Sequence, residues 1–230
     1  MMKKSLTLVE LLLAISIFSV VAVMLYSVFN MGITAWRKME AVLERYQELR
    51  LLLDRMALEL HNALDLDIKD FFKDFLPPET VVSDFQGELG KLVFYTLKNG
   101  EIRSILYKVE EDKEKKEGLA LSVFTLKRSE RKFSPVPFKD GEFQEEAVFS
   151  LIKELKFFYL ERKDEGGVLK ETWQENWGKE DKEKDFLPAQ VKISIVFYVP
   201  VYLPVGRRID YQEISIEKYV DIITSPRKLL

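Results

Sequence analysis

The longest run of hydrophobic positions lies close to the start of the chain. Residues 11–36 include no charged side chain, and residues 11–29 are almost all aliphatic or aromatic. As a helix rising about 1.5 Å per residue, this run extends roughly 39 Å, which exceeds the ~30 Å hydrocarbon core of a bilayer. It is too long for the hydrophobic region of a secretory signal, and no A-x-A cleavage site follows it. The pattern therefore predicts a membrane-spanning helix over residues 6–36.

The spacing of hydrophobic positions changes after Trp36, but no helix-breaking residue follows before Pro77. Hydrophobic residues recur at steps of three and four, which is the period of an amphipathic helix. They are Met39, Val42, Leu43, Tyr46, Leu49, Leu53, Met56, Leu60, Ala63 and Leu64. We expect one continuous helix from about Leu6 to the middle 60s, whose second half, residues 37–66, lies outside the membrane.

Beyond Pro77 the pattern shortens into strand-length units. Lys98-Asn99-Gly100 separates two hydrophobic stretches, and Asn-Gly is the strongest short indication of a β-hairpin. The charged run 110–117 predicts a solvated turn, and 134–138, with two prolines, predicts a loop or an edge strand. The expected strands cover residues 91–97, 101–109, 119–128, 149–160, 190–199 and 209–223, and the start of 149–160 also fits a helical turn.

This order of elements predicts an α+β fold. A long N-terminal helix, transmembrane and then amphipathic, is expected to pack on an antiparallel β-sheet. The sheet is expected to lie in a globular domain at residues 67–230.

Composition narrows the functional classes. The 230 residues carry a formal net charge of −3 without a basic stripe, so we expect no nucleic-acid partner, because neutralisation of phosphates supplies most of that affinity. The chain has no cysteine, which excludes disulfides, thiolate metal sites and cysteine nucleophiles.

Catalytic and metal-binding patterns are sparse. No G-x-S-x-G, H-E-x-x-H or P-loop occurs, and His61, the single histidine, is expected to have a structural or exposed role. The charged stretches 110–117 and 178–185 mix lysine with acids and lack EF-hand spacing, so we predict solvated loops, no metal and no cofactor. A hydrolase with two facing carboxylates is the enzymatic alternative left open, because Asp and Glu are abundant.

Glu10 is an unusual residue, because it stands at the beginning of the hydrophobic run. It is either a flanking charge in the headgroup region or a carboxylate with a specific partner. A carboxylate that enters a bilayer costs about 2–3 kcal/mol unless it is paired, which favours the second interpretation.

The stretch Ser5-Leu6-Thr7-Leu8-Val9-Glu10 resembles the processing site of type IV pilins and type II secretion pseudopilins. In these proteins a dedicated peptidase cuts on the cytoplasmic face and N-methylates the new amine. The resemblance implies cleavage between Ser5 and Leu6, methylation of Leu6, and motif positions at Thr7 and Leu8. It also implies that Glu10 pairs with the terminal amine of an adjacent subunit. Ser5 replaces the usual glycine and Leu6 the more common phenylalanine.

The C-terminal half resembles the family of minor pseudopilin J of type II secretion. In that family an aromatic strand and a variable loop precede a Trp-x-x-x-Trp segment, a Leu-Pro pair and a Val-x-Ile strand. The matching positions here are Trp173, Trp177, Leu187, Pro188, Val191 and Ile193. We expect structural roles for both tryptophans, each capping an edge of the core.

The resemblance implies a non-enzymatic protein of the bacterial inner membrane, with a cytoplasmic N-terminus and a periplasmic globular domain. The positive-inside rule does not fix this orientation, because basic residues flank the span on both sides. The implied partners are minor pseudopilins I and K, the major pseudopilin, the prepilin peptidase and inner-membrane lipid. The implied function is to form the tip of a short filament that aids export of folded proteins. A minor type IV pilin for pilus assembly, adhesion or DNA uptake is the alternative.

Overall fold

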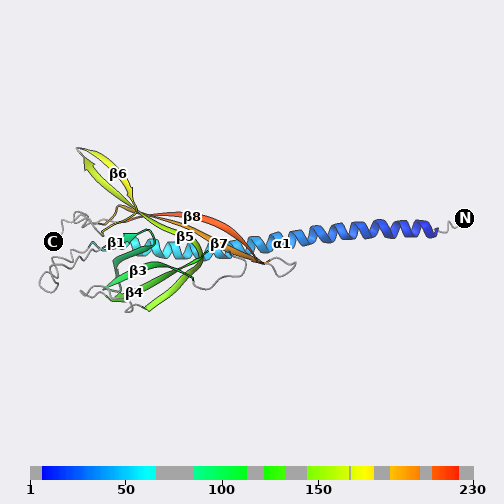
Figure 1. Cartoon of the computed structure of the whole chain (residues 1–230), viewed down its shortest axis with the longest axis horizontal. Coiled ribbons are helices and arrows are strands. Elements are labelled where there is room, and N and C mark those ends of the chain that lie inside the picture. Colours follow the sequence, from blue (N-terminus) through cyan, green and yellow to red (C-terminus); the bar gives the residue numbers. More distant parts are fainter. Residues whose placement is uncertain are drawn as a thin grey trace.

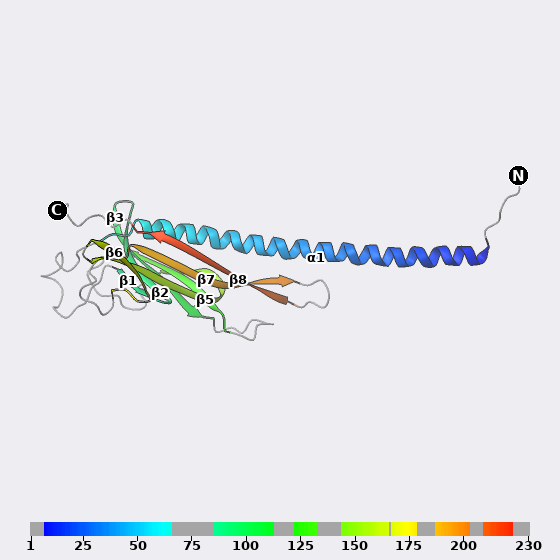
Figure 2. The ribbon, with the colours of Figure 1, turned by 90° about the horizontal axis from the view of Figure 1, so that it is seen from above.

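A computed structural model describes residues 7–65, 85–112, 122–132, 144–165, 167–178, 187–202 and 209–222. One helix, α1 (Leu8–His61), contains 54 residues, which corresponds to a rod about 81 Å long. Its N-terminal half extends from a globular head, and its C-terminal half lies against the head (Figures 1 and 2). The predicted continuous helix is therefore confirmed, although it ends at His61 rather than in the middle 60s.

The head contains one antiparallel sheet. Its strands are β1 (Phe85–Glu88), β2 (Lys91–Lys98), β3 (Glu101–Glu111), β4 (Phe124–Lys132), β5 (Gln144–Glu165), β6 (Val168–Gln174), β7 (Gln190–Tyr202) and β8 (Ile209–Asp221). They are ordered β1-β2-β3-β4-β5-β7-β8, and β6 pairs with β5 beside this path. The predicted fold class, a long helix on an antiparallel sheet, is confirmed.

The core forms where the second half of α1 meets the sheet. The helix contributes Leu49, Leu52, Leu53, Met56 and Leu60, all of which are buried. Alternate residues of β7 from Val191 to Val201 are buried too, because successive side chains of a strand point to opposite faces. The hydrophobic residues that recur every 3.6 positions in the helix thus pack against those that alternate along the strands, and together they form one core.

The β2–β3 hairpin confirms the prediction made from Asn99-Gly100. Asn99 has φ 54° and Gly100 has φ 77°, and positive φ at both central residues is characteristic of a type I′ turn. Lys98 pairs with Glu101 across this turn. The twist of a type I′ turn matches that of the strands it joins, so this dipeptide fixes the register of the hairpin.

Strand β5 is longer than predicted and irregular near its start. Its register with β4 and β7 shifts around Ile152, and Leu151 has φ 59°. The structure thus has a β-bulge where the sequence also fitted a helical turn. The far end of β5 and all of β6 leave the body of the sheet as a two-stranded ribbon, here called the arm (Figure 1).

Other strand bounds differ from expectation. Strands β1 and β6 were not predicted, and β4 is shifted towards the C-terminus, ending at Lys132 rather than Arg128. Glu110 and Glu111 belong to β3, not to the predicted turn. Glu110 pairs across the sheet near Lys127, and such opposite-charge pairs stabilise adjacent strands. Residues 113–121, 134–138 and 179–186 lie outside the described residues.

Candidate functional site

The outer half of α1 is the first candidate for function. By length and composition α1 is the one helix among the described residues that could cross a membrane, and the hydrophobic segment that qualifies it is not buried inside the protein. Leu8, the first helical residue, is 76% exposed, and large hydrophobic side chains are exposed at most positions as far as Trp36 and at some positions beyond it. So much exposed apolar surface requires lipid or other helices around it.

Thr7 and Glu10 form a capping box at the start of this helix. The Thr7 backbone N–H and the Thr7 hydroxyl both donate to Oε2 of Glu10, at 2.9 and 3.0 Å. In return, the Glu10 backbone N–H donates to the Thr7 hydroxyl at 3.4 Å. The box satisfies N–H groups that the first helical turn leaves without partners.

The capping box gives Glu10 a local role that the sequence interpretation missed. The spacing Thr7-x-x-Glu10 is itself the sequence pattern of a capping box and could have revealed it. Within the described residues Oε1 of Glu10 makes no hydrogen bond. The carboxylate can therefore keep its cap and still accept a further donor. Ser5 and Leu6, the predicted cleavage positions, lie outside the described residues.

A polar cluster attaches the opposite end of α1 to the sheet. Arg128 on β4 donates to Oε1 and Oε2 of Glu59 on the helix, at 2.7 and 3.3 Å. The Tyr107 hydroxyl on β3 donates to Oε2 of Glu59 at 2.6 Å. Arg128 also donates to Glu130 at 2.9 Å. We call Glu59, Tyr107, Arg128 and Glu130 the helix–sheet clamp.

Burial and charge perturb the clamp. Burial and the negative charge of Glu59 raise the pKa of Tyr107 far above its usual range. Burial opposes the charge on Arg128, but hydrogen bonds to Glu59 and Glu130 outweigh it and raise the Arg128 pKa. Burial likewise opposes the charge on Glu130, but Lys98 and Arg128 lower its pKa to about 2. Glu130 and Arg128 therefore stay ionised at neutral pH, and Arg128 holds the helix through charge-assisted hydrogen bonds to Glu59.

Trp177 lies in the core. It is 1% exposed, and its backbone exchanges hydrogen bonds of 2.9 and 3.0 Å with Gly87 of β1. A Cβ on Gly87 would lie 2.1 Å from the ring of Tyr159, so only glycine fits this close approach. Leu187 and Pro188, which are two of the other matched positions, are also buried.

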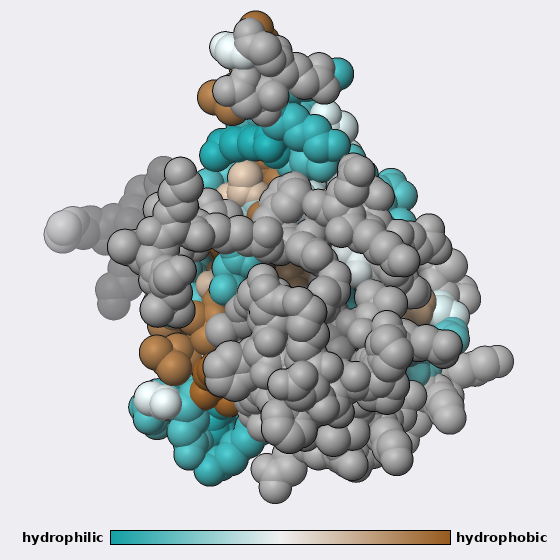
Figure 3. Space-filling view, turned by 90° about the vertical axis from the view of Figure 1, so that its left-hand side faces the viewer, coloured by the Kyte–Doolittle hydropathy of each residue, from teal (hydrophilic) through white to brown (hydrophobic). Residues whose placement is uncertain are grey.

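Trp173 does not lie at a core edge. It belongs to β6, is 43% exposed, and meets Tyr219 of β8 in an edge-to-face contact with ring centroids 6.1 Å apart. It was expected in a loop before a strand, but it lies on β6, which pairs with β5. Figure 3 looks onto the end of the head farthest from the N-terminus and shows the arm as the projection at the top.

His61 ends α1, and its Nδ1 lies 3.2 Å from the backbone oxygen of Asp221. The histidine therefore has a structural contact between the helix end and β8. Among the described residues, no group of three or more His, Cys, Asp or Glu side chains could hold a metal ion.

Comparison with known proteins gives one match. A profile described as the prokaryotic N-terminal methylation motif matches residues 1–26. The chain carries a type IV pilin-like prepilin signal. In the other comparisons, neither a curated protein nor a solved structure matches it.

The prepilin signal explains the outer half of α1. Such a signal implies processing by a prepilin peptidase and assembly with other pilin-like subunits. The capping box of Thr7 and Glu10 lies within the matched residues 1–26, and the exposed apolar part of the helix begins within them. A single N-terminal apolar helix fits the membrane anchor typical of prepilin-like proteins.

Proposed function

We propose that this protein is a minor pseudopilin of a type II secretion system, non-enzymatic and part of the tip of its filament. The observation that carries the proposal is the prepilin signal at residues 1–26 on a helix that continues unbroken into a β-rich head. The resemblance of Trp173, Trp177, Leu187 and Pro188 to the J family supports the choice of secretion over a type IV pilus. The partners are then minor pseudopilins I and K and the major pseudopilin.

In this proposal the anchor occupies residues 6–36 in the inner membrane, with the N-terminus in the cytoplasm and the head in the periplasm. The peptidase cuts between Ser5 and Leu6 and methylates Leu6. Thr7 then becomes the second residue of the mature chain. The amine at Leu6 of one subunit pairs with Glu10 of its neighbour, through the carboxylate oxygen that the capping box leaves available.

Assembly through Glu10 is tested by replacing its charge while keeping its cap. Gln serves at this position of a capping box as well as Glu does, so Glu10→Gln isolates the charge. Removing one partner of a buried ion pair costs about 3–5 kcal/mol, so co-purification of I- and K-type partners with the tagged full chain is expected to fall about a hundredfold or more.

The matched control is Glu44→Gln, since Glu44 is an exposed acid of the same helix outside the prepilin signal. Equal recovery of partners with wild type and Glu10→Gln contradicts a role for the charge in assembly. Recovery of type IV pilus subunits in place of I- and K-type proteins favours the minor pilin alternative.

Processing is tested separately by intact-mass spectrometry of the protein from cells that contain the peptidase. The expected mature chain begins at Leu6 and carries one added methyl group. A Ser5→Gly variant restores the residue usual in the family and is expected to process at least as completely. A chain that still begins at Met1 in such cells contradicts the cleavage assignment.

A further inference from the structure

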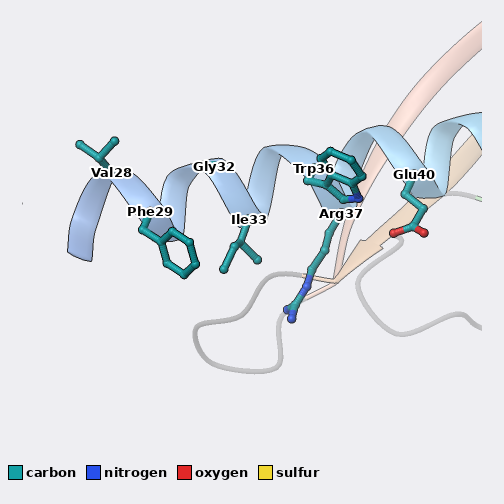
Figure 4. A pocket seen from close by; sticks show the side chains of 7 residues that line it. All are labelled: Val28, Phe29, Gly32, Ile33, Trp36, Arg37 and Glu40. Carbon is teal, nitrogen blue, oxygen red and sulfur yellow. The ribbon is translucent and has the colours of Figure 1, made fainter. Parts of the chain in front are cut away.

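An open groove lies on α1 where the helix leaves the predicted membrane. It is a shallow, open hollow of about 630 Å³, and the described residues that line it all belong to α1. Val28, Phe29, Ile33 and Trp36 give it a largely apolar lining (Figure 4). Its apolar residues belong to the last turns of the predicted anchor, residues 6–36, whereas Arg37 and Glu40 lie just beyond it. The groove thus crosses the boundary between hydrocarbon and headgroups.

Two opposite charges stand at the polar end of the groove. Arg37 and Glu40 both line it, and within the described residues neither makes an ion pair. A guanidinium binds phosphate oxygens through two parallel hydrogen bonds, whereas a carboxylate accepts hydrogen bonds from an ammonium. A ligand that matches both must carry a phosphate and an ammonium close together, next to a hydrocarbon chain.

Gly32 keeps the middle of the groove open. It is the one glycine in α1, although glycine weakens a helix relative to alanine. A Cβ at Gly32 would meet nothing within 4 Å, so no packing within the described chain requires a glycine there. The missing side chain instead leaves space between the Phe29 and Trp36 positions.

We infer that this groove binds a phospholipid with a phosphoethanolamine headgroup while the subunit resides in the membrane. The acyl chain lies along Phe29 and Ile33, the phosphate meets Arg37, and the ammonium donates to Glu40. Trp36 lies at the interface, where tryptophan is enriched in membrane proteins. The inference rests only on insertion of α1 in a bilayer, not on processing or filament assembly.

Trp36 provides the measurement. The full-length protein is reconstituted in bilayers in which phosphatidylethanolamine, phosphatidylglycerol or phosphatidylcholine, in turn, carries bromine near the carbonyl end of its acyl chains. Bromine quenches tryptophan fluorescence at short range, and subtraction of a Trp36→Phe variant isolates the Trp36 contribution. Brominated phosphatidylethanolamine is expected to quench about two- to fivefold more than its mole fraction predicts, the range expected for an exposed charge pair.

Variants separate the contributions to binding. Glu40→Gln is expected to remove the preference for phosphatidylethanolamine over both other lipids, because only its primary ammonium donates to a carboxylate. Arg37→Gln is expected to weaken the same preference, because the phosphate contact that positions the ammonium is lost. Gly32→Phe fills the groove and is expected to abolish every preference, whereas Gly32→Ala is the matched control that retains them. Arg50→Gln, at an exposed arginine of the same helix beyond the groove, is expected to change nothing.

Several results overturn the inference. Equal quenching by all three lipids shows that the groove selects no headgroup, and a preference for phosphatidylglycerol overturns the ammonium contact. If no brominated lipid quenches Trp36 at high protein density, but quenching appears when the protein is diluted in the bilayer, a second copy of the chain occupies the groove. Because unprocessed and unassembled protein is used, these results are independent of the Glu10 and cleavage experiments.

Discussion

The two halves of α1 are continuous in backbone but differ in what surrounds them. Towards the N-terminus, hydrophobic side chains such as Leu25 are exposed to the outside of the molecule. In the C-terminal half, Leu53 and Met56 are buried by the head's own sheet. The outer half extends away from the head, whereas the inner half lies along it (Figure 1). The exposed apolar surface of the outer half therefore needs lipid or other helices around it.

The carboxylates of the two halves show the same contrast. Glu10 is held by Thr7, three residues away, so its contacts form in an isolated subunit. Glu59 is held by Tyr107 and Arg128, which lie 48 and 69 residues further along the chain. A carboxylate with local contacts remains available to a partner molecule, whereas one with distant contacts secures the fold.

The largest expected effect comes from breaking the helix–sheet clamp. Arg128→Met leaves Glu59 and Glu130 close together without the guanidinium between them. Removing one partner of a buried ion pair costs about 3–5 kcal/mol, so the free energy of unfolding of the full chain in detergent is expected to fall by that amount. It can be measured in urea through the fluorescence of buried Trp177.

The control for the clamp is Arg50→Met. Arg50 is highly exposed and lies 3.9 Å from Asp54 on the same helix, and exposed pairs contribute about 0–1 kcal/mol. Equal losses of stability in the two variants would show that the clamp does not hold the helix to the head.

A matched pair of leucines compares the two halves directly. Leu53 is 5% exposed and Leu25 is 66% exposed. Leu53→Ala is expected to lower the free energy of unfolding of the head by about 2–5 kcal/mol, the usual cost of a truncated core leucine. Leu25→Ala is expected to leave it unchanged in the same urea titration. A comparable loss from Leu25→Ala would mean that the outer half also packs on the head.

The smallest expected effect is a pH dependence that arises from Glu130. Its pKa falls from 4.5 to about 2 on folding, so folding is favoured when Glu130 is ionised. This contribution is fully present above pH 4.5 and is lost as the pH falls towards 2. Glu130→Gln is expected to flatten the decline of stability with pH over that interval. An unchanged slope would assign the acid sensitivity to other carboxylates.

The sequence predicted the elements whose causes are local. The 3.6-residue period produced the long helix, and Asn99-Gly100 produced the β2–β3 hairpin, because a type I′ turn depends on only two residues. The arm could also have been predicted from a local sequence pattern. Gly166-Gly167 lies between β5 and β6, and Gly-Gly is a recognised hairpin sequence, but the surrounding charges concealed it.

Features that depend on distant residues were missed. The predicted strand ended at Arg128, whereas β4 continues to Lys132. Arg128 is buried, and Glu59 on the helix neutralises its charge. Strand β1 contains Gly87, which is read locally as a turn residue but is required by the ring of Tyr159. At the candidate site, the sequence interpretation gave Glu10 a partner in another subunit and Thr7 a place in the processing motif, and it missed the hydrogen bonds that join the two residues.

The uninterrupted course of α1 has a mechanical consequence. No proline and one glycine lie between Leu8 and His61, so the helix has no joint that could absorb a change in length. In the proposed filament, a force that lifts the head by one subunit's rise must move the other end of the helix by an equal distance. The anchor and the head would then move together as one rigid body. The anchor would leave the bilayer at the same time as the head is displaced, and not after it.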